Sequence, residues 1–390
     1  MAAPITTTYA PWIDESECRL DDFRSQVLRD TDPAEYPHAS EMRSNVPVYS
    51  ATEVSRVAGA QRQALQSELI RALADGPGVV VFTDAFPPEI VDRANEGFFA
   101  IIAAQRDTGT TAGDHFGKPG ANDRIWNAAQ KLALYAPDVF AEYYANDTLA
   151  IVCQAWLGPR YQVTSQVNVV NPGGTQQVPH RDYHLGFVPD EHLAQYPAHL
   201  HRTSPVLTLQ GAVAHCDMPV ESGPTMLLPG SQRFAGGYIA FNRPEFVDFF
   251  GEHHVQLPLK KGDAVFFNPA LYHGAGSNVS GDIRRIANLL QISSPFGRAM
   301  EALDRTAMVR TVYPSLLAMK AAGCPSRDLY NAVVATADGY AFPTNLDSDR
   351  PVGSLAPPSQ VDAVLTALAE DLGADELDVL LRAQQERRMP

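Results

Sequence analysis

The chain has 390 residues and a formal charge of −15, with 45% hydrophobic and 19% charged residues. This composition predicts a folded protein with enough length to bury one large core or two modest ones. The acidic balance argues against nucleic acid or an anionic membrane surface as a partner, because both are bound through clustered Lys and Arg.

The first part of the chain predicts an irregular arm followed by helices. Residues 1–50 are polar and rich in proline, so we expect an irregular N-terminal arm. Residues 51–75 carry apolar groups at helical spacing and end at a glycine, which predicts a helix. The β-branched run 78–86 predicts a strand, and the double proline that closes it opens a second helical pattern. Residues 126–157 continue the helical pattern.

Short strand-like runs fill the middle of the chain, from about residue 160 to residue 297. They are RYQVTSQVNVV, PVLTLQGAVAH, TMLLPG, HVQLPLKKGDAVFFN and IRRIANLLQISS, separated by Gly, Pro, Asn or Asp turns. Such a series predicts an antiparallel sandwich or jelly roll. Helical patterns return in residues 298–390, where turn-rich residues 338–359 interrupt them and a helix at 360–388 closes the chain.

We therefore predict an α+β fold that is mainly β with flanking helices. Residues 51–297 would form the main domain, and residues 298–390 a helical extension packed on or near it.

The stretch VPHRDYHLGF contains the first of two H-x-D motifs in the chain. In an extended strand alternate side chains share a face, so His180 and Asp182 would point to one side and Arg181 and Tyr183 to the other. An imidazole and a carboxylate on one face are two members of the 2-His-1-carboxylate set of non-haem Fe(II) oxygenases. His273 is the best candidate for the third, because it follows a strand and a proline turn and precedes small residues.

An arginine follows the distal histidine at a fixed distance. Arg284 lies eleven positions after His273 and opens a run that predicts a strand leaving the site. A guanidinium binds a carboxylate through two parallel hydrogen bonds, which suits a dicarboxylic co-substrate. Arg285 would take this place if the strand were shifted by one residue, but the spacing favours Arg284.

This combination of motifs resembles the phytanoyl-CoA dioxygenase-like branch of Fe(II)/2-oxoglutarate oxygenases. HGAGSNVSGDIRR resembles the distal-histidine segment of that family, and GVVVFTDAFPPE its opening strand and helix. ESGPTMLLPGSQR resembles its Pro-Gly-Ser segment, with Gln232 where a histidine is usual. The resemblance runs from about residue 75 to about residue 297.

The resemblance implies a double-stranded β-helix (jelly-roll) core, with Fe(II) as cofactor and 2-oxoglutarate and O2 as co-substrates. The positions that match the family's metal ligands are His180, Asp182 and His273. Arg284 matches the position that pairs with the C5 carboxylate of 2-oxoglutarate.

Two details refine the expected site. Position 275 is alanine where a hydroxyl residue can help to hold the co-substrate, so we expect Gln166 or Asn168 on the preceding strand to contribute. Asp182 is retained, whereas halogenating relatives replace that carboxylate with a small residue. The aspartate therefore favours oxygen chemistry such as hydroxylation.

Four residues near the motifs are candidates for substrate contact: Tyr183, His184, Phe187 and Arg233. His184 has an equal alternative as a packed or surface histidine, and Arg233 as a surface cation. Phe187 and the irregular segment 188–205 are expected to form a lid over the site, because such loops carry specificity.

The second H-x-D motif is His215-Cys216-Asp217, at the end of a strand-like run that enters a turn. We expect a hydrogen-bonded histidine and a turn-forming aspartate there, not metal ligands.

The resulting hypothesis is an Fe(II)- and 2-oxoglutarate-dependent oxygenase that hydroxylates an unactivated C–H bond and releases succinate and CO2. Its substrate would be a small molecule, such as a specialised metabolite, an amino acid or an acyl compound. Desaturation, ring formation or rearrangement would use the same residues, and a cupin-like metalloenzyme without 2-oxoglutarate is the alternative.

The expected partners and location follow from composition. We expect a small-molecule substrate and neither nucleic acid nor membrane, and we leave a homodimer open. No apolar run reaches the roughly 18 residues of a membrane helix, and no signal-peptide pattern is visible. The four scattered cysteines indicate free thiols in a reducing compartment, hence a cytoplasmic location.

Overall fold

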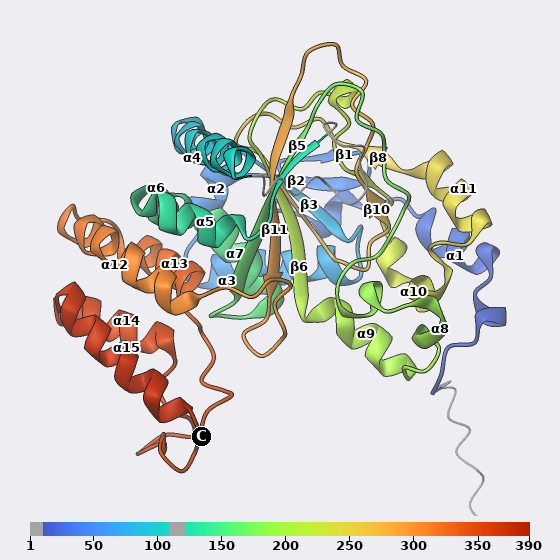
Figure 1. Ribbon diagram of the computed structural model, residues 1–390. Coiled ribbons are helices and arrows are strands. Elements are labelled where there is room, and N and C mark those ends of the chain that lie inside the picture. The colour runs from blue at the N-terminus through green and yellow to red at the C-terminus, as the bar shows by residue number, and fades with distance from the viewer. Residues whose placement is uncertain (1–10, 109–121) are drawn as a thin grey trace, which may run out of the picture.

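The computed structural model describes residues 11–108 and 122–390 and is built around two β-sheets (Figure 1). Within these residues the larger sheet has eight strands in the order β1-β2-β3-β9-β6-β11-β5-β4, and the smaller has three in the order β10-β7-β8. Apart from the parallel pair β2 and β3, neighbouring strands are antiparallel. The predicted jelly-roll core is confirmed.

The strands are β1 (Glu41–Arg43), β2 (Val46–Ser50), β3 (Val79–Thr83), β4 (Asn122–Ile125), β5 (Gln162–Val170), β6 (Thr208–Ala214), β7 (Met226–Leu227), β8 (Val255–Gln256), β9 (Ala264–Phe267), β10 (His273–Gly274) and β11 (Arg285–Ser293).

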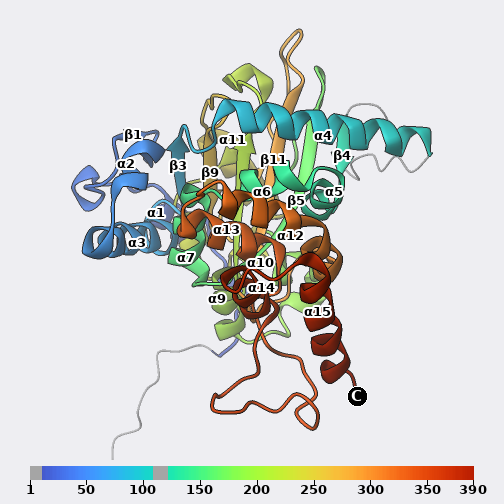
Figure 2. The same cartoon turned by 90° about the vertical axis from the view of Figure 1, so that its left-hand side faces the viewer.

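Helices cover one face of the larger sheet, as Figure 2 shows. In the N-terminal half these are α2 (Ala51–Arg56), α3 (Gly59–Ala74), α4 (Pro88–Asp107), α5 (Ala128–Tyr135), α6 (Pro137–Tyr144) and α7 (Asp147–Leu157). In the C-terminal part they are α12 (Arg305–Ala321), α13 (Ser326–Thr336), α14 (Gln360–Ala369) and α15 (Ala374–Arg388). Both groups contribute to one apolar cluster, so the C-terminal extension packs on the same core as the rest of the chain.

The remaining helices lie outside this layer. They are α1 (Leu20–Val27), α8 (Asp190–Leu193), α9 (Ala198–Val206), α10 (Gly237–Ala240) and α11 (Pro244–His253). In the described part of the chain, five 3₁₀ turns accompany them: η1 (Glu15–Glu17), η2 (Pro33–Glu35), η3 (His184–Phe187), η4 (Val220–Ser222) and η5 (Ser231–Arg233).

Alternation along the strands separates the two faces of the larger sheet. In β3, Val80 and Phe82 pack under the helices, whereas Val79 and Val81 belong to a second apolar cluster that includes Leu227 of the smaller sheet. Both faces are buried, which explains why the strands read as nearly continuous apolar runs. The face toward the smaller sheet is called the inner face below.

The prediction of an irregular arm over residues 1–50 is corrected by the structure. Residues 1–10 lie outside the described residues, but β1 and β2 extend the larger sheet. In β2, Val48 lies opposite Val81 of β3, and the ring of Tyr49 stacks on Phe82 with centroids 5.2 Å apart. A five-residue strand gives little sequence signal, because its stability comes from contacts with distant residues.

Two predicted helices are each divided in the structure. Residues 51–75 form α2 and α3, which are separated before Gly59, whose φ of 54° is in the left-handed region. Residues 360–388 form α14 and α15, and Asp371 between them has a φ of 53°. The turn-rich residues 338–359 contain neither helix nor strand, as predicted.

Candidate metal centre and cavity

A cavity of about 500 Å³ opens between the two sheets. The inner faces of β5, β6 and β11 supply much of its wall. Its described lining holds the three expected ligands together with aliphatic side chains, several amides and the buried Arg285.

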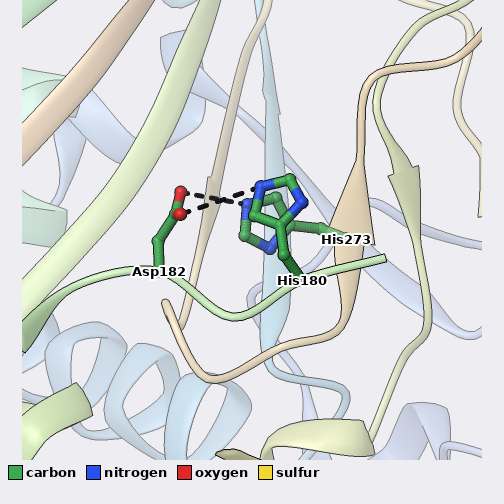
Figure 3. Close-up of side chains that lie close together, drawn as sticks. All are labelled: His180, Asp182 and His273. Carbon is green, nitrogen blue, oxygen red and sulfur yellow. Dashed lines mark ion pairs between the residues drawn. The ribbon is translucent and has the colours of Figure 1, made fainter. Parts of the chain in front are cut away.

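His180, Asp182 and His273 converge at one side of this cavity (Figure 3). Their ligand atoms all lie within 4.8 Å of one another. Asp182 Oδ1 is 3.7 Å from His180 Nε2, and Asp182 Oδ2 is 3.4 Å from His273 Nε2. The backbones of the two histidines pair directly: His180 N–H donates to His273 O at 3.0 Å, and His273 N–H donates to His180 O at 3.2 Å.

Both imidazoles are oriented so that Nε2 faces the carboxylate. His180 Nδ1 lies 3.0 Å from the carbonyl oxygen of Val178, and His273 Nδ1 lies 2.9 Å from that of Leu271. A carbonyl only accepts hydrogen bonds, so each Nδ1 carries the proton and each Nε2 lone pair is left for a metal. Two such imidazoles and one carboxylate match the donor set that non-haem iron prefers.

The carboxylate is held in its ionised form. Burial by itself would raise the pKa of Asp182, but His180, His273 and the Gln210 amide outweigh it and keep that pKa well below its usual range. Gln210 Nε2 donates to Asp182 Oδ2 at 2.5 Å, and the Asp182 N–H donates to Pro269 O at 3.1 Å. Burial lowers the pKa of His180, which favours the neutral ring that binds metals.

Arg284, the predicted partner of the co-substrate, lies outside the cavity. Its side chain is exposed, with Nη2 3.8 Å from an oxygen of Asp123 and the guanidinium 5.4 Å from the ring centroid of Phe99 on α4. Ile286, two positions along, also packs on the helix side of the sheet. Arg284 shares that side because alternate residues of a strand share a face.

Arg285 occupies the position that was expected for Arg284. It is 6% exposed and lines the cavity, on the same face as Ala287. Its Nη1 makes only long contacts, 3.4 Å to Gly276 O and 3.5 Å to Ser222 O. Burial lowers its pKa to about 10, so the group stays charged at neutral pH. Among the described residues no carboxylate pairs with it, which leaves a buried cation suited to an anionic ligand.

The two amides predicted on the preceding strand both line the cavity. Gln166 accepts a hydrogen bond from Arg124, and its Nε2 lies 3.5 Å from the sulfur of Met300. Asn168 lies opposite Ala287 in the sheet, and its buried Oδ1 has no hydrogen-bond partner among the described residues.

Of the four residues predicted to contact the substrate, only one belongs to the described lining of the cavity. Phe187 lines the cavity and is exposed at 55%, whereas Tyr183 and His184 are absent from the described lining. Tyr183 and His184 have φ values of 63° and 39°, so the extended segment ends at Asp182 and the chain turns away. His184, a candidate substrate contact, is therefore not part of the described cavity lining.

Arg233 is also not a cavity residue. Its guanidinium donates to the carbonyl oxygen of Asp75 at 3.0 Å, to that of Gly230 at 3.2 Å and to that of Gln26. It therefore joins η5 to the N-terminal segment and to the end of α3, and the prediction of a substrate contact is corrected.

Arg181, between the two ligands of the H-x-D motif, points away from the metal centre but is buried, not solvent-exposed. Its guanidinium lies 5.0 Å from the ring centroid of Tyr238 and 5.1 Å from that of Tyr272. It donates to Ser231 O at 2.6 Å. A Cβ at Gly237 would lie 1.9 Å from Arg181 Cζ, so glycine is needed there.

His215 is a structural histidine, as predicted. Its Nδ1 lies 2.7 Å from Asn95 Oδ1 and its Nε2 2.9 Å from the hydroxyl of Tyr143. The arrangement is satisfied by a neutral ring, and burial lowers its pKa to about 3. Asp217 accepts from the Lys261 N–H at 2.9 Å and so links two segments that are far apart in the sequence.

Sequence reasoning missed Gln210 and Gln291, two further amides of the cavity wall. A signal was present: each is a polar residue inside a strand that is otherwise largely apolar. A buried polar side chain in such a run needs a hydrogen-bonding role.

Comparison with protein-family models gives a match to Phytanoyl-CoA dioxygenase (PhyH) over residues 74–286, more than half of the chain. The chain belongs to the phytanoyl-CoA dioxygenase family. The resemblance expected from the motifs is thereby confirmed. The family's cofactors, Fe(II) and the co-substrate 2-oxoglutarate, agree with the 2-His-1-carboxylate set that the structure brings together.

Several solved structures are similar to this member of the phytanoyl-CoA dioxygenase family, at low sequence identity. The epimerase SnoN, in complex with Fe3+, alpha ketoglutarate and nogalamycin RO, is 19% identical, with 60% of this chain and 85% of that chain covered and a TM-score of 0.41. AviO1 from Streptomyces viridochromogenes Tue57 is 19% identical, with coverages of 62% and 99% and a TM-score of 0.42.

EctD from S. alaskensis with 2-oxoglutarate and 5-hydroxyectoine is 20% identical, with coverages of 59% and 77% and a TM-score of 0.43. Comparison with curated proteins gives no significant match. Within the described parts of the chain, no helix is long and apolar enough to cross a membrane.

Proposed function

We propose that this protein is an Fe(II)- and 2-oxoglutarate-dependent oxygenase that hydroxylates a C–H bond of a small molecule. The observation that carries the proposal is the joint presence, in one cavity, of a 2-His-1-carboxylate set and a buried arginine without a carboxylate partner among the described residues. The first suits iron and the second suits the far carboxylate of a dicarboxylic acid.

The three ligands are prepared for a divalent metal before it binds. His180 and His273 keep their protons on Nδ1 through backbone carbonyls, and Asp182 is kept ionised by its neighbours. When bound, the iron together with 2-oxoglutarate would supply the oxidising chemistry, with succinate and CO2 as products. The protein's own contribution is to fix these ligands and to enclose the cavity between the sheets.

Arg285 would pair with the C5 carboxylate of 2-oxoglutarate. Asn168 is the amide best placed to assist, because it faces Ala287, the next inner-face residue after Arg285 along β11. Gln166 lies one inner-face position further and would contact the same ligand or the space beside it. Position 275 has no side-chain hydroxyl, and the Ala275 N–H already donates to Gln177 Oε1 at 3.0 Å.

Retention of Asp182 supports hydroxylation over halogenation, because the carboxylate fills the coordination position that a halide would need. A cytoplasmic location remains a prediction from the composition and the four unpaired cysteines.

The proposal is tested by anaerobic titration of the full-length protein with Fe(II) and then 2-oxoglutarate. A weak visible metal-to-ligand charge-transfer band should develop, and aerobic incubation should then release succinate. The band should be lost in His180→Ala and retained in His199→Ala, a matched substitution at an exposed histidine of α9. Absence of the band in the wild-type protein, or its survival in His180→Ala, would overturn the proposal.

A further inference from the structure

Two kinds of contact orient the three expected metal ligands. The imidazoles of His180 and His273 are each held through Nδ1 by a backbone carbonyl, which is present whatever side chains surround it. The carboxylate of Asp182 is held by a side chain instead, because Gln210 Nε2 donates to Asp182 Oδ2 at 2.5 Å. Apart from the two histidines, no other described side chain forms a hydrogen bond or ion pair with that carboxylate.

The backbone of Asp182 does not by itself fix the direction of the carboxylate. The extended segment of the H-x-D motif ends at this residue, and the next two residues have left-handed φ values of 63° and 39°. The Asp182 N–H donates to Pro269 O at 3.1 Å, and the Tyr238 hydroxyl donates to Asp182 O at 3.3 Å. These bonds hold the main chain, but they do not restrict rotation about the Cα–Cβ bond. The orientation of the carboxylate therefore depends on what touches it.

Gln210 offers a rigid support for this carboxylate. It lies within β6 in the larger sheet, opposite Gln291 of β11 on one side and Phe267 of β9 on the other. Its side chain is buried, its amide makes no second hydrogen bond among the described residues, and its carbonyl oxygen is buried without a partner. A buried acceptor without a partner is unfavourable, so a glutamine at this position needs a reason. The bond to Asp182 supplies that reason.

The bond to Gln210 engages only part of the carboxylate. It involves Oδ2, whereas no hydrogen bond from the described residues reaches Asp182 Oδ1. A side chain that hydrogen-bonds a metal ligand in this way fixes the orientation of the ligand, and its loss typically weakens metal binding by about 10- to 100-fold.

Building on the proposed function, we propose that Gln210 is a positioning residue for the metal centre: its amide holds the Asp182 carboxylate beside the two imidazoles, so that the three ligand groups are arranged before a metal binds. Gln210 acts through Asp182 and needs no contact with the metal or the substrate. Gln291 provides an internal comparison. It is the same type of residue, lies opposite Gln210 in the sheet and lines the same cavity, but it forms no hydrogen bond or ion pair with any of the three ligands.

The experiment measures Ni(II) binding to the full-length protein by isothermal titration calorimetry, followed by addition of 2-oxoglutarate. Imidazole suits both nickel and iron, and Ni(II) does not activate O2, so the measurement is independent of turnover. Gln210→Met keeps the approximate volume of the side chain and removes the donor. The dissociation constant for Ni(II) should rise by about 10- to 100-fold in this variant.

Two further variants complete the test. Gln210→Asn keeps an amide but withdraws it by one methylene from Asp182, so it should lose Ni(II) affinity to a similar extent and replaces Gln210→Met if that variant does not fold. Gln291→Met makes the same chemical change on the neighbouring strand and should leave the dissociation constant for Ni(II) within twofold. Urea unfolding of the metal-free variants accompanies the calorimetry, because a loss of stability that leaves the protein folded does not change the dissociation constant.

The outcomes separate this inference from the function on which it rests. If the wild type binds Ni(II) but does not then bind 2-oxoglutarate, the proposed function fails while the role of Gln210 is still tested. If the wild type does not bind Ni(II), both fail. Wild-type affinity for Ni(II) in a folded Gln210 variant would overturn the positioning role alone. An equal loss in Gln291→Met would also overturn it, because the effect would then belong to the cavity wall and not to the bond with Asp182.

Discussion

At the scale of single residues, the neighbours Arg284 and Arg285 show how strand geometry assigns function. Adjacent side chains of a strand point to opposite faces, so one arginine meets the helices and the other the cavity. We expect Arg285→Ala to raise the KM for 2-oxoglutarate by roughly 10- to 100-fold, the effect of losing a charged hydrogen-bonding partner.

The matched substitution Arg284→Ala should change that KM less than twofold, because the Arg284 side chain is exposed and lies outside the cavity. Both values come from succinate formation at varied 2-oxoglutarate concentration. If Arg284→Ala raised the KM for 2-oxoglutarate more than Arg285→Ala, the residue that pairs with the co-substrate would be Arg284, as the motif spacing favours.

The metal ligands could be predicted from sequence, whereas the arginine could be placed only to within one residue. The triad rests on residue types and spacing, and these are visible in the sequence. The sequence does not show which residues of β11 face the cavity, because Ile286 and Ala287 are both apolar and the strand is buried on both faces. The sequence predicted that Arg181 points away from the metal ligands. Its burial between two tyrosines could not be predicted, because the tyrosines come from segments that are distant in the sequence.

His215 predicts a pH dependence of stability. Its pKa is about 3 in the folded protein and about 6.5 when unfolded. Between these values the unfolded chain binds a proton that the folded protein does not, so the free energy of unfolding falls as the pH is lowered from about 6.5 to 3. One such group contributes a slope of about 1.4 kcal/mol per pH unit.

His215→Gln should reduce that slope while lowering stability at pH 7 through the altered hydrogen bonds. Urea unfolding at several pH values between 4.5 and 7 measures both quantities. A slope identical to that of the wild type would show that His215 is protonated in the folded state.

At the scale of elements, β2 is the clearest departure from the sequence expectation. A strand in a polar, proline-rich region becomes part of the main sheet because it pairs with β3 and because Tyr49 packs on Phe82 and donates to Glu68 at 3.0 Å. The helices were predicted better, since a 3.6-residue period extends over several turns within a single segment.

We expect Tyr49→Ala to lower the free energy of unfolding by about 3–5 kcal/mol, as for other large aromatic core residues. If residues 1–50 formed an irregular arm, Tyr49→Ala would leave the free energy of unfolding almost unchanged. Chemical denaturation compares this variant with Tyr340→Ala, at a half-exposed tyrosine, which should cost less than about 1 kcal/mol.

At the scale of the whole molecule, the C-terminal helices belong to the same folding unit as the sheets. Arg305 of α12 donates to Val163 O of β5 and to Ala335 O of α13, both at 2.7 Å. Arg160 joins the start of β5 to Asp362 of α14 at 2.6 Å. The helical layer therefore supports β5, the strand whose inner face carries two amides of the cavity.

Proteolysis offers a test of this unity. The segment 350–356 includes Val352 and Leu355, which are 93% and 100% exposed, so it is the expected site of a first cut. The two fragments should separate under denaturing conditions but elute together from a sizing column in native buffer. Release of the α14–α15 fragment in native buffer would show that the extension is held weakly.

The reciprocal backbone pairing of His180 and His273 has a consequence for local motion. Each residue's amide hydrogen is bonded to the other's carbonyl, so neither strand segment can lift without releasing both bonds. Deuterium exchange at these two amides should therefore report one shared opening event and proceed at similar rates. The two histidines proposed to bind the metal are far apart in the sequence, but their backbone segments are expected to open together.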